Sequence, residues 1–163
     1  MYKKISFMLA SFFGAGYFPV APGTFGSLVT LPFAFVLAYC YGLYGVAALV
    51  VVSFIIGWIV SVEVLKYTKH DPSLIVIDEV CGQSITLLPL AAMMQGNTNV
   101  VLVLLVGFAL FRLFDITKPF PASWADKKIR NALGVMLDDV FAGCYGAICL
   151  WLINRCFNLF IGF

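Results

Sequence analysis

The sequence predicts an all-α protein, a polytopic transmembrane helical bundle of about four to five membrane helices with a short N-terminal interfacial helix. Hydrophobic residues make up 63% of the 163 residues and charged residues only 11%, whereas soluble domains are about half apolar and a quarter charged. No residue between Lys4 and Glu63 carries a formal charge, and about 18 such apolar residues already suffice for one transmembrane helix. The net charge of +2 gives no indication of nucleic-acid binding.

The first half of the chain is predicted to form an interfacial segment, a loop and a helical hairpin. Residues 1–13 combine two lysines with an apolar stretch, as is typical of a helix at a membrane surface. Four glycines and two prolines in residues 14–27 argue against a continuous helix, and a loop at membrane depth must be buried in protein or line a wet cavity. Residues 28–41 and 46–62 are predicted to be spanning helices joined by a turn at 42–45.

The second half of the chain alternates apolar and polar segments. The apolar segments, each a candidate for the membrane, are residues 74–94, 100–111 and 140–153. The polar segments between and before them are residues 63–73, 95–99 and 118–130. No change in composition marks a domain boundary, so we predict a single integral membrane domain over residues 1–163.

The basic residues indicate the orientation of this bundle in the bilayer. If the apolar segments alternate as hairpins, most lysines and arginines fall on one side of the membrane, whereas the turns at 42–45 and 95–99 carry no charge. Basic residues are enriched in cytoplasmic loops. The basic side, which also carries the acidic residues, is therefore predicted to face the cytoplasm.

Five carboxylates are predicted at three helix ends on that side. Asp78 and Glu79 begin one helix, Asp115 ends another, and Asp138 and Asp139 lead a third. A charge at bilayer depth costs about 2.5–3.5 kcal/mol on insertion scales, so this group of acids indicates a function. Gathered carboxylates repel one another and attract cations, and oxygen ligands suit Mg²⁺ or Mn²⁺. All five are therefore candidate metal ligands and catalytic residues.

These charged residues also have simpler interpretations. A helix N-terminus stabilises an acidic side chain through the backbone dipole, although this accounts for one acid per helix and not for an adjacent second one. Asp115 has basic residues three positions to either side, Arg112 and Lys118, and an ion pair with one of them is its alternative role. Both basic residues are candidate phosphate ligands, Arg112 because of its planar guanidinium group, with anchoring at the membrane edge as the alternative.

The glycine-rich loop and the only histidine offer further candidates for substrate binding. Gly23, Thr24 and Ser27 lie at the start of the first predicted spanning helix, where backbone N–H groups bind anions. N-capping by Thr24 or Ser27 is the alternative interpretation. His70 lies in a polar segment next to Asp71, and a solvated loop residue is the alternative to a role in binding or catalysis.

Four separated sequence blocks occur in a characteristic order. They are Gly16 to Pro19 with Ala21 to Leu28; His70-Asp71 with Ile75 to Val80 and Gly82; Phe111 to Ile116 with Lys118, Pro119 and Pro121; and Gly134 to Met136 with Asp138 to Val140, Ala142 and Gly143. This pattern resembles the bacterial phosphatidylglycerophosphatase A family. The resemblance implies an inner-membrane phosphoric monoester hydrolase that converts phosphatidylglycerophosphate to phosphatidylglycerol and phosphate with Mg²⁺. It also implies that the family's acidic positions are Asp78, Glu79, Asp115, Asp138 and Asp139, and its basic ones Arg112 and Lys118.

Phosphoryl transfer depends mainly on positioning and charge neutralisation. We expect the carboxylates to hold one or two Mg²⁺ ions and Asp78 or Glu79 to act as a base, while the basic residues and the 24–27 loop stabilise phosphate charge. A covalent aspartyl-phosphate is the competing route. Two other functions stay open: a phosphatidyl transferase, whose expected run of spaced aspartates is absent, and a small ion transporter, whose polar residues would continue through the spans.

Overall fold

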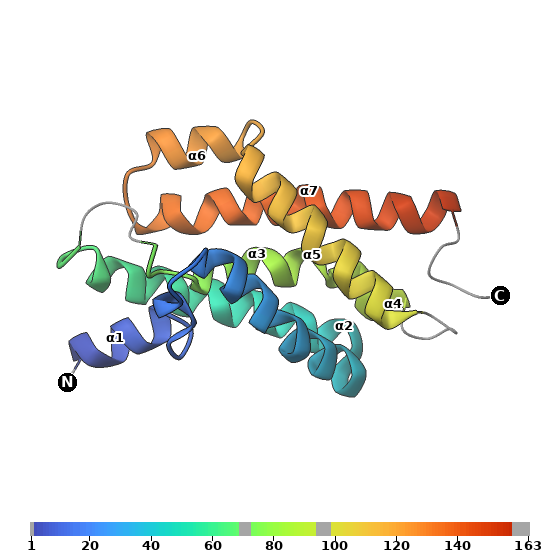
Figure 1. The fold of residues 1–163 in the computed structure, drawn as a ribbon, viewed down its shortest axis with the longest axis horizontal. Helices are drawn as coiled ribbons and strands as arrows, with labels where there is room; N and C mark the ends of the chain where they lie inside the picture. Colours follow the sequence, from blue (N-terminus) through green and yellow to red (C-terminus); the bar gives the residue numbers. More distant parts are fainter. Residues whose placement is uncertain (1, 69–72, 94–98, 158–163) are drawn as a thin grey trace.

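The computed structural model describes residues 2–68, 73–93 and 99–157, and within these ranges the regular structure is entirely helical (Figure 1). The helices are α1 (Tyr2–Ala10), the short 3-10 helix η1 (Ala15–Tyr17), α2 (Pro22–Val64), α3 (Ile77–Thr86), α4 (Leu88–Met93), α5 (Val100–Thr117), α6 (Ala122–Lys128) and α7 (Ala132–Phe157). Three of them, α2, α5 and α7, are long and apolar enough to cross a membrane. The all-α prediction is confirmed, while the count of four to five membrane helices stays a prediction.

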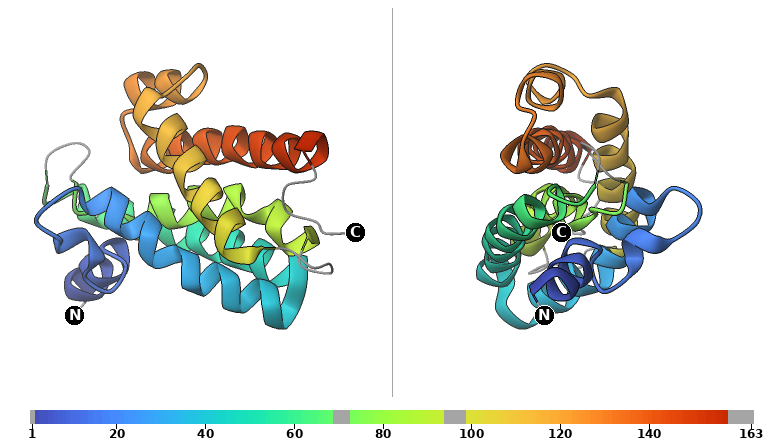
Figure 2. Two further views of the ribbon diagram at one scale, coloured as in Figure 1. Left: turned by 45° about the vertical axis from the view of Figure 1, so that its right-hand side comes forward. Right: turned by 90° about the vertical axis from the view of Figure 1, so that its left-hand side faces the viewer.

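Helix α2 is a hairpin that reverses at Gly42. Gly42 has φ 59° and ψ −142°, a conformation that glycine adopts readily because it has no Cβ atom. The two arms, residues 22–41 and 43–64, are each about 30 Å long at 1.5 Å per residue, which matches the hydrocarbon core of a bilayer. Figures 1 and 2 show that both ends of α2 lie at the same end of the bundle.

The first arm of this hairpin begins earlier than the sequence predicts. The expected spanning helix started at residue 28, but α2 starts at Pro22, so the second half of the predicted glycine-rich loop is helical. Proline is tolerated in the first turn because its missing N–H would have no partner within the helix. The preceding residue, Ala21, has a left-handed backbone conformation with φ 49° and breaks the chain direction before the helix.

Helix α3 lies inside the bundle, packed between α2 and α7. Nine of its ten residues are buried, so its polar groups face protein and not lipid. The close approach to α7 depends on glycines: a Cβ atom added at Gly82 would come within 2.6 Å of the Asp139 carbonyl oxygen, and Gly143 lies against Gly82. The Thr86 hydroxyl bridges the two helices by donating to the Gly143 carbonyl at 3.2 Å. This contact fixes the position of α3 relative to α7.

One end of the bundle gathers the segments that carry the charged residues. The first residues of α2, α3 and α7, the end of α5 and the whole of α6 lie toward this end, whereas the Gly42 reversal, α4 and the start of α5 lie at the other (Figures 1 and 2). Segments from the first, middle and last parts of the chain therefore meet there.

Candidate functional site: an acidic cavity at the helix ends

Asp78 and Glu79 lie in the first turn of α3, as the sequence predicts. The two residues contact each other, since the Glu79 N–H donates to Asp78 Oδ1 at 3.1 Å. Asp78 is only 8% exposed and Glu79 is partly buried. The helix dipole stabilises one negative charge at this N-terminus. Two buried carboxylates next to each other therefore need a further partner that stabilises their charge.

Asp138 and Asp139 do not begin a helix, and the expectation that they do is wrong. Helix α7 starts at Ala132 and is capped by Asn131, whose Oδ1 accepts from the backbone N–H groups of Leu133 at 2.9 Å and Gly134 at 3.2 Å. The two aspartates therefore lie well inside the helix, beyond the first turn in which the dipole acts. Capping does not explain them.

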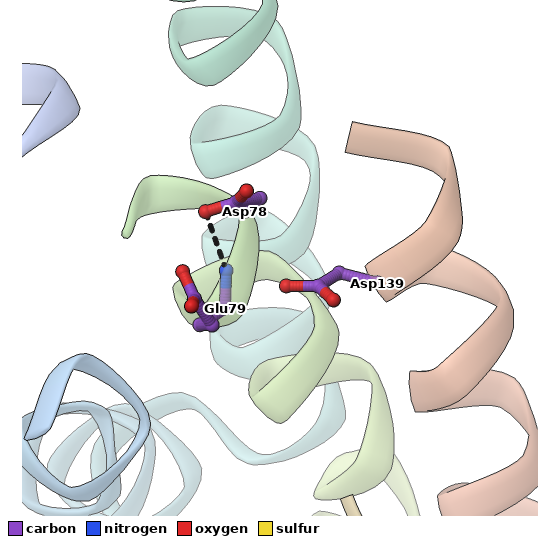
Figure 3. A group of neighbouring side chains, drawn as sticks. All are labelled: Asp78, Glu79 and Asp139. Carbon is purple, nitrogen blue, oxygen red and sulfur yellow. Dashed lines mark hydrogen bonds between the residues drawn. The ribbon is translucent and has the colours of Figure 1, made fainter. Parts of the chain in front are cut away.

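Three of the predicted carboxylates form a compact cluster. One carboxylate oxygen each of Asp78, Glu79 and Asp139 lies within 4.8 Å of the others, and Figure 3 shows the three side chains from α3 and α7 pointing toward one another. The first turn of α3 and an inner turn of α7 thus bring these three acids together, and the two helices approach closely at Gly82 and Gly143.

A cavity of about 280 Å³ surrounds this cluster and holds all five predicted acids. Six carboxylates line it against two cationic side chains, so the site carries a large excess of negative charge. The charged lining residues are Asp78, Glu79, Asp115, Asp126, Asp138, Asp139, Arg112 and Lys118. Such an excess of carboxylates is stabilised by protons or by bound cations.

Arg112 and Asp115 lie one turn apart near the end of α5 and form an ion pair, with Arg112 Nη1 at 2.5 Å from Asp115 Oδ2. The alternative pairing predicted for Asp115 is therefore present, and Asp115 still lines the cavity. Arg112 Nε is buried and has no hydrogen-bond partner among the described residues. A buried donor of this kind is suited to an anionic oxygen that enters the cavity.

Lys118 connects α5 to two carboxylates. It follows the helix with a left-handed backbone, φ 41°, and its Nζ lies 2.8 Å from Asp126 Oδ1 and 2.7 Å from Asp138 Oδ2. Burial alone would lower the pKa of Lys118, but the hydrogen bonds to Asp126 and Asp138 outweigh it and raise the pKa above its usual value. Lys118 is therefore a permanent cation at neutral pH.

Asp126 is a cavity residue that the sequence analysis does not select. It precedes Lys127 and Lys128, which are exposed, and a charged run of this kind is typical of a solvated face. Asp126 instead lines the cavity and pairs with Lys118. No local pattern reveals this pairing, because it depends on how α6 folds back beside α7.

The glycine-rich segment contributes backbone to the site. Gly23 lines the cavity and lies against the Glu79 carboxylate, so closely that an added Cβ atom would overlap it. The N-cap of α2 is Ala21, without a side-chain cap, so the alternative interpretation of Thr24 or Ser27 as the helix cap does not hold. The Ser27 hydroxyl donates to the Gly23 carbonyl at 2.8 Å, and neither Thr24 nor Ser27 is among the lining residues.

His70 and Asp71, the remaining candidates, lie outside the described residues.

The first turn of α2 has backbone N–H groups that find no partner inside the helix. Gly23 belongs to this turn and lines the cavity, so these N–H groups lie close to it. Participation of this turn in anion binding stays a prediction.

The donor set fits a small divalent cation. Three carboxylate oxygens converge within 4.8 Å, and Glu79 Oε2 is buried without a hydrogen-bond partner in the described part of the chain. The cavity lining contains no cysteine or histidine among the residues that the structure describes. All-oxygen ligands of this kind suit Mg²⁺ or Mn²⁺ better than Zn²⁺.

The chain matches a known protein family over most of its length. The family model described as phosphatidylglycerophosphatase A matches residues 8–154. A phosphatidylglycerophosphatase A of Escherichia coli (strain K12) is 35% identical over 154 residues, which cover 91% of this chain and 83% of the relative. The Haemophilus influenzae protein of the same name is 34% identical and covers 93% of both chains.

A third relative carries a different name. A Bacteroides thetaiotaomicron protein named "Putative phosphatidylinositol-3-phosphatase" is 34% identical over 163 residues, which cover 93% of this chain and 99% of the relative. No solved structure gives a significant match to the chain. The family model and the relatives confirm the assignment predicted from the sequence blocks: this chain belongs to the phosphatidylglycerophosphatase A family of phosphatases.

Proposed function

We propose that this protein is a Mg²⁺-dependent phosphatase that hydrolyses phosphatidylglycerophosphate to phosphatidylglycerol and inorganic phosphate. The observation that carries the proposal is the acidic cavity at the ends of α2, α5 and α7, the three helices able to span a membrane. A phosphomonoester on a lipid headgroup can reach this cavity while the acyl chains stay in the bilayer.

Asp78, Glu79 and Asp139 are the proposed metal ligands, with Asp115 and Asp138 as further ligands in the same cavity. When bound there, Mg²⁺ would supply neutralisation of the phosphate charge and a lowered pKa for an attacking water. The chain itself supplies the carboxylates in a fixed arrangement, because α3 is buried and locked against α7.

The anionic phosphate is proposed to contact the cationic side of the cavity. Arg112 Nε is an available buried donor, and its guanidinium group is held by Asp115. The first-turn N–H groups of α2 adjoin the same space through Gly23. Lys118 is held by two carboxylates, so we propose that it orients Asp138 and adds positive charge near the phosphate.

A carboxylate completes the reaction in one of two ways. Asp78 or Glu79 removes a proton from water, and the water oxygen bonds to phosphorus while the P–O bond to the glycerol oxygen breaks. The glycerol oxygen takes up a proton, so that phosphatidylglycerol and inorganic phosphate are released. Alternatively, an aspartate attacks phosphorus, the glycerol oxygen leaves, and water then hydrolyses the aspartyl-phosphate. Acid quenching during turnover with a radiolabelled terminal phosphate distinguishes the two, because only the second route labels the protein.

We further propose that the cavity faces the cytoplasm of a bacterium and that the membrane is the inner one. Most of the described basic residues belong to elements at the end of the bundle that carries the cavity (Figure 1). They lie in α1, in α6 and just after α2, α5 and α6, and are Lys3, Lys4, Lys66, Lys118, Lys127, Lys128 and Arg130, whereas Arg155 belongs to the last turn of α7. This distribution follows the positive-inside rule.

Phosphate release from the purified protein in detergent tests the proposal. Asp78→Asn and Asp139→Asn should each reduce kcat/KM about 100-fold or more, the scale of losing one group that stabilises the transition state. Glu63→Gln is the matched control, since Glu63 pairs with Lys66 at 2.6 Å and is not among the cavity-lining residues. Unchanged hydrolysis in both aspartate variants would contradict the proposed site.

A panel of lipid phosphates tests the substrate. Phosphatidylglycerophosphate should be hydrolysed faster than phosphatidylinositol 3-phosphate, the substrate suggested by the name of the Bacteroides relative. Preference for the inositol lipid would move the assignment to that substrate while leaving the site intact. Activity with a nucleotide-linked lipid, or metal-dependent ion flux without phosphate release, would instead favour the transferase or transporter alternatives.

A further inference from the structure

A groove lies along α1, apart from the acidic cavity. Its volume is about 540 Å³, and its lining residues come from α1 and from the segment that follows it as far as η1. The lining includes Lys3, Lys4, Phe7, Met8, Phe13 and Tyr17. Among the described residues, none that lines this groove also lines the acidic cavity. A ligand in the groove is therefore held by residues that the proposed mechanism does not use.

The α1 side of the groove is a single face of the helix. Lys3 precedes Phe7 by four residues. Lys4 precedes Met8 by the same number, and residues with this spacing lie one turn apart on the same face of an α-helix. Helix α1 lies at the end of the bundle that carries the acidic cavity, with its N-terminus pointing outward (Figure 1). The two lysines therefore lie at the outer end of the groove, and the two apolar side chains lie one turn closer to the body of the bundle.

The outer end of the groove is positively charged. Lys3 and Lys4 are exposed, and neither forms an ion pair with a carboxylate within the described part of the chain. The Lys3 ammonium group lies 4.1 Å from the centre of the Tyr67 ring, a contact that positions the lysine without neutralising its charge. The described lining residues include no aspartate or glutamate. The groove therefore attracts an anion, whereas the acidic cavity attracts a cation.

The inner part of the groove is an exposed apolar surface. Met8, Phe13 and Tyr17 line it and are 46%, 69% and 62% exposed. Apolar side chains gathered beside lysines in this way are typical of a surface that contacts lipid. A small soluble anion would pair with the lysines and leave the apolar side chains uncovered, whereas a phospholipid covers both parts of the groove.

Contacts with the segment before α3 hold the groove in shape. Ala10, at the end of α1, is fully buried, and its carbonyl accepts a hydrogen bond from the Val76 N–H at 2.9 Å. Gly16, in η1, packs against the Leu74 carbonyl group. Helix α1 and η1 are therefore fixed to the same segment, as is typical of a preformed ligand site.

We propose that this groove binds one anionic phospholipid of the surrounding bilayer, as a ligand that is not the substrate. The phosphodiester of its headgroup pairs with Lys3 and Lys4, and the first carbons of an acyl chain lie against the apolar side chains farther along the groove. Attraction of the headgroup and burial of the acyl chain then act together. The proposal goes beyond the proposed function and does not depend on it, because the groove lies outside the acidic cavity.

Native mass spectrometry of the purified protein in detergent, titrated with phosphatidylglycerol, measures this binding. EDTA is present throughout, so that the acidic cavity holds no divalent cation and its carboxylates repel the headgroup. The unmodified protein should bind one phosphatidylglycerol about tenfold or more tightly than phosphatidylcholine with the same acyl chains. The double variant Lys3→Gln, Lys4→Gln should raise the dissociation constant for phosphatidylglycerol about 30-fold, because each lysine contributes about fivefold to the attraction of an anionic lipid.

The double variant Lys127→Gln, Lys128→Gln is the matched control. It removes the same charge from two exposed lysines of α6 that line neither the groove nor the acidic cavity. Its dissociation constant should stay within about threefold of that of the unmodified protein, because exposed charges away from the groove are screened by salt. Equal losses in the two double variants would show an effect of net charge alone and overturn the proposal. So would equal affinities for the two lipids, or an unchanged affinity after replacement of Lys3 and Lys4.

The contact with the acyl chain is tested separately by Met8→Gln. This change removes apolar surface from the groove and should raise the dissociation constant about fivefold. Ile5→Gln is its control, because Ile5 is an equally exposed apolar residue of α1 that does not line the groove, and its dissociation constant should not change. An unchanged constant for Met8→Gln would overturn the assignment of a lipid in favour of a soluble anion, and equal losses in both variants would overturn the position of the site.

Thermal unfolding without added lipid reports whether each variant is folded. The substituted side chains are exposed, so their unfolding temperatures should match that of the unmodified protein. Lys3 also contacts the Tyr67 ring, so if the double variant is destabilised, Lys4→Gln alone replaces it, with an expected rise of about fivefold in the dissociation constant. Full affinity for phosphatidylglycerol in a folded Lys4→Gln protein would overturn the proposal.

Discussion

Replacement of Gly23 by alanine probes the contact between the first turn of α2 and the acidic cluster. A Cβ atom at this position would overlap Glu79 Oε1 and come within 3.1 Å of Glu79 Cδ and 3.4 Å of Arg112 Nη1. Non-bonded carbon atoms prefer separations of about 3.5–4.0 Å, so the Glu79 carboxylate must move by about 1 Å. The backbone of Gly23 is helical and accepts alanine without strain.

The expected effect falls on activity and not on folding. Misplacement of a reacting group by about 1 Å can cost about 100-fold in rate, which corresponds to about 2.7 kcal/mol of activation free energy. Alanine is a better helix former than glycine by about 1 kcal/mol. Gly23→Ala should therefore lose about 100-fold in kcat with an unfolding temperature equal to or above that of the unmodified protein.

Phosphate release from phosphatidylglycerophosphate in detergent, paired with thermal unfolding, measures both effects. Gly107→Ala is the control, because its added Cβ atom meets only side-chain atoms, the nearest being Leu87 Cδ2 at 2.8 Å, away from the cavity. Its activity should stay within about threefold. The reasoning would be refuted if Gly23→Ala kept its activity within threefold, since Glu79 would then tolerate displacement or lie elsewhere.

Two further predictions concern the ends of α5 and α7. Asn131→Ala removes the cap of α7 and should cost about 1 kcal/mol of stability, seen as a lower unfolding temperature with an unchanged Mg²⁺ requirement; no change in unfolding would contradict the capping role. Lys118 has a raised pKa, so it stays charged below its unfolded value of about 10.4 and its ion pairs are lost only above that pH. Arginine does not titrate in this range, so the rate of the Lys118→Arg protein should depend on pH up to about pH 9.5 in the same way as the rate of the unmodified protein. If the Lys118→Arg protein instead stayed active to higher pH than the unmodified protein, Lys118 would be losing its proton during the assay.

Much of the fold follows from local composition. The uncharged stretch between Lys4 and Glu63 predicts a membrane hairpin, and glycine at position 42 supplies the backbone freedom for its reversal. Boundaries were less predictable. Helix α2 starts at Pro22, six residues before its predicted start, because a proline in the first turn of a helix resembles a loop residue in the sequence. Helix α7 starts at Ala132, six residues before the acidic pair, because the Asn131 cap likewise resembles a loop residue.

The sequence predicts those residues of the candidate site whose charge is energetically unfavourable beside an apolar segment. Carboxylates next to apolar segments are unfavourable in a membrane, so Asp78, Glu79 and Asp139 could be selected from the sequence and expected to meet. Their mutual distances could not, because they depend on the glycine contact between α3 and α7. Asp126 gave no such signal, since a charged residue within a polar segment is ordinary in isolation.

The sequence by itself determined that this chain is helical, membrane-embedded and acidic beside a few apolar segments, because hydrophobicity and charge act on each segment independently of its neighbours. Only the tertiary structure decided which charges share a cavity, with Lys118 joining Asp126 to Asp138 and Arg112 held by Asp115. Electrostatic and hydrogen-bond energies depend on distance and burial, and for residues far apart in the chain both are set by helix packing.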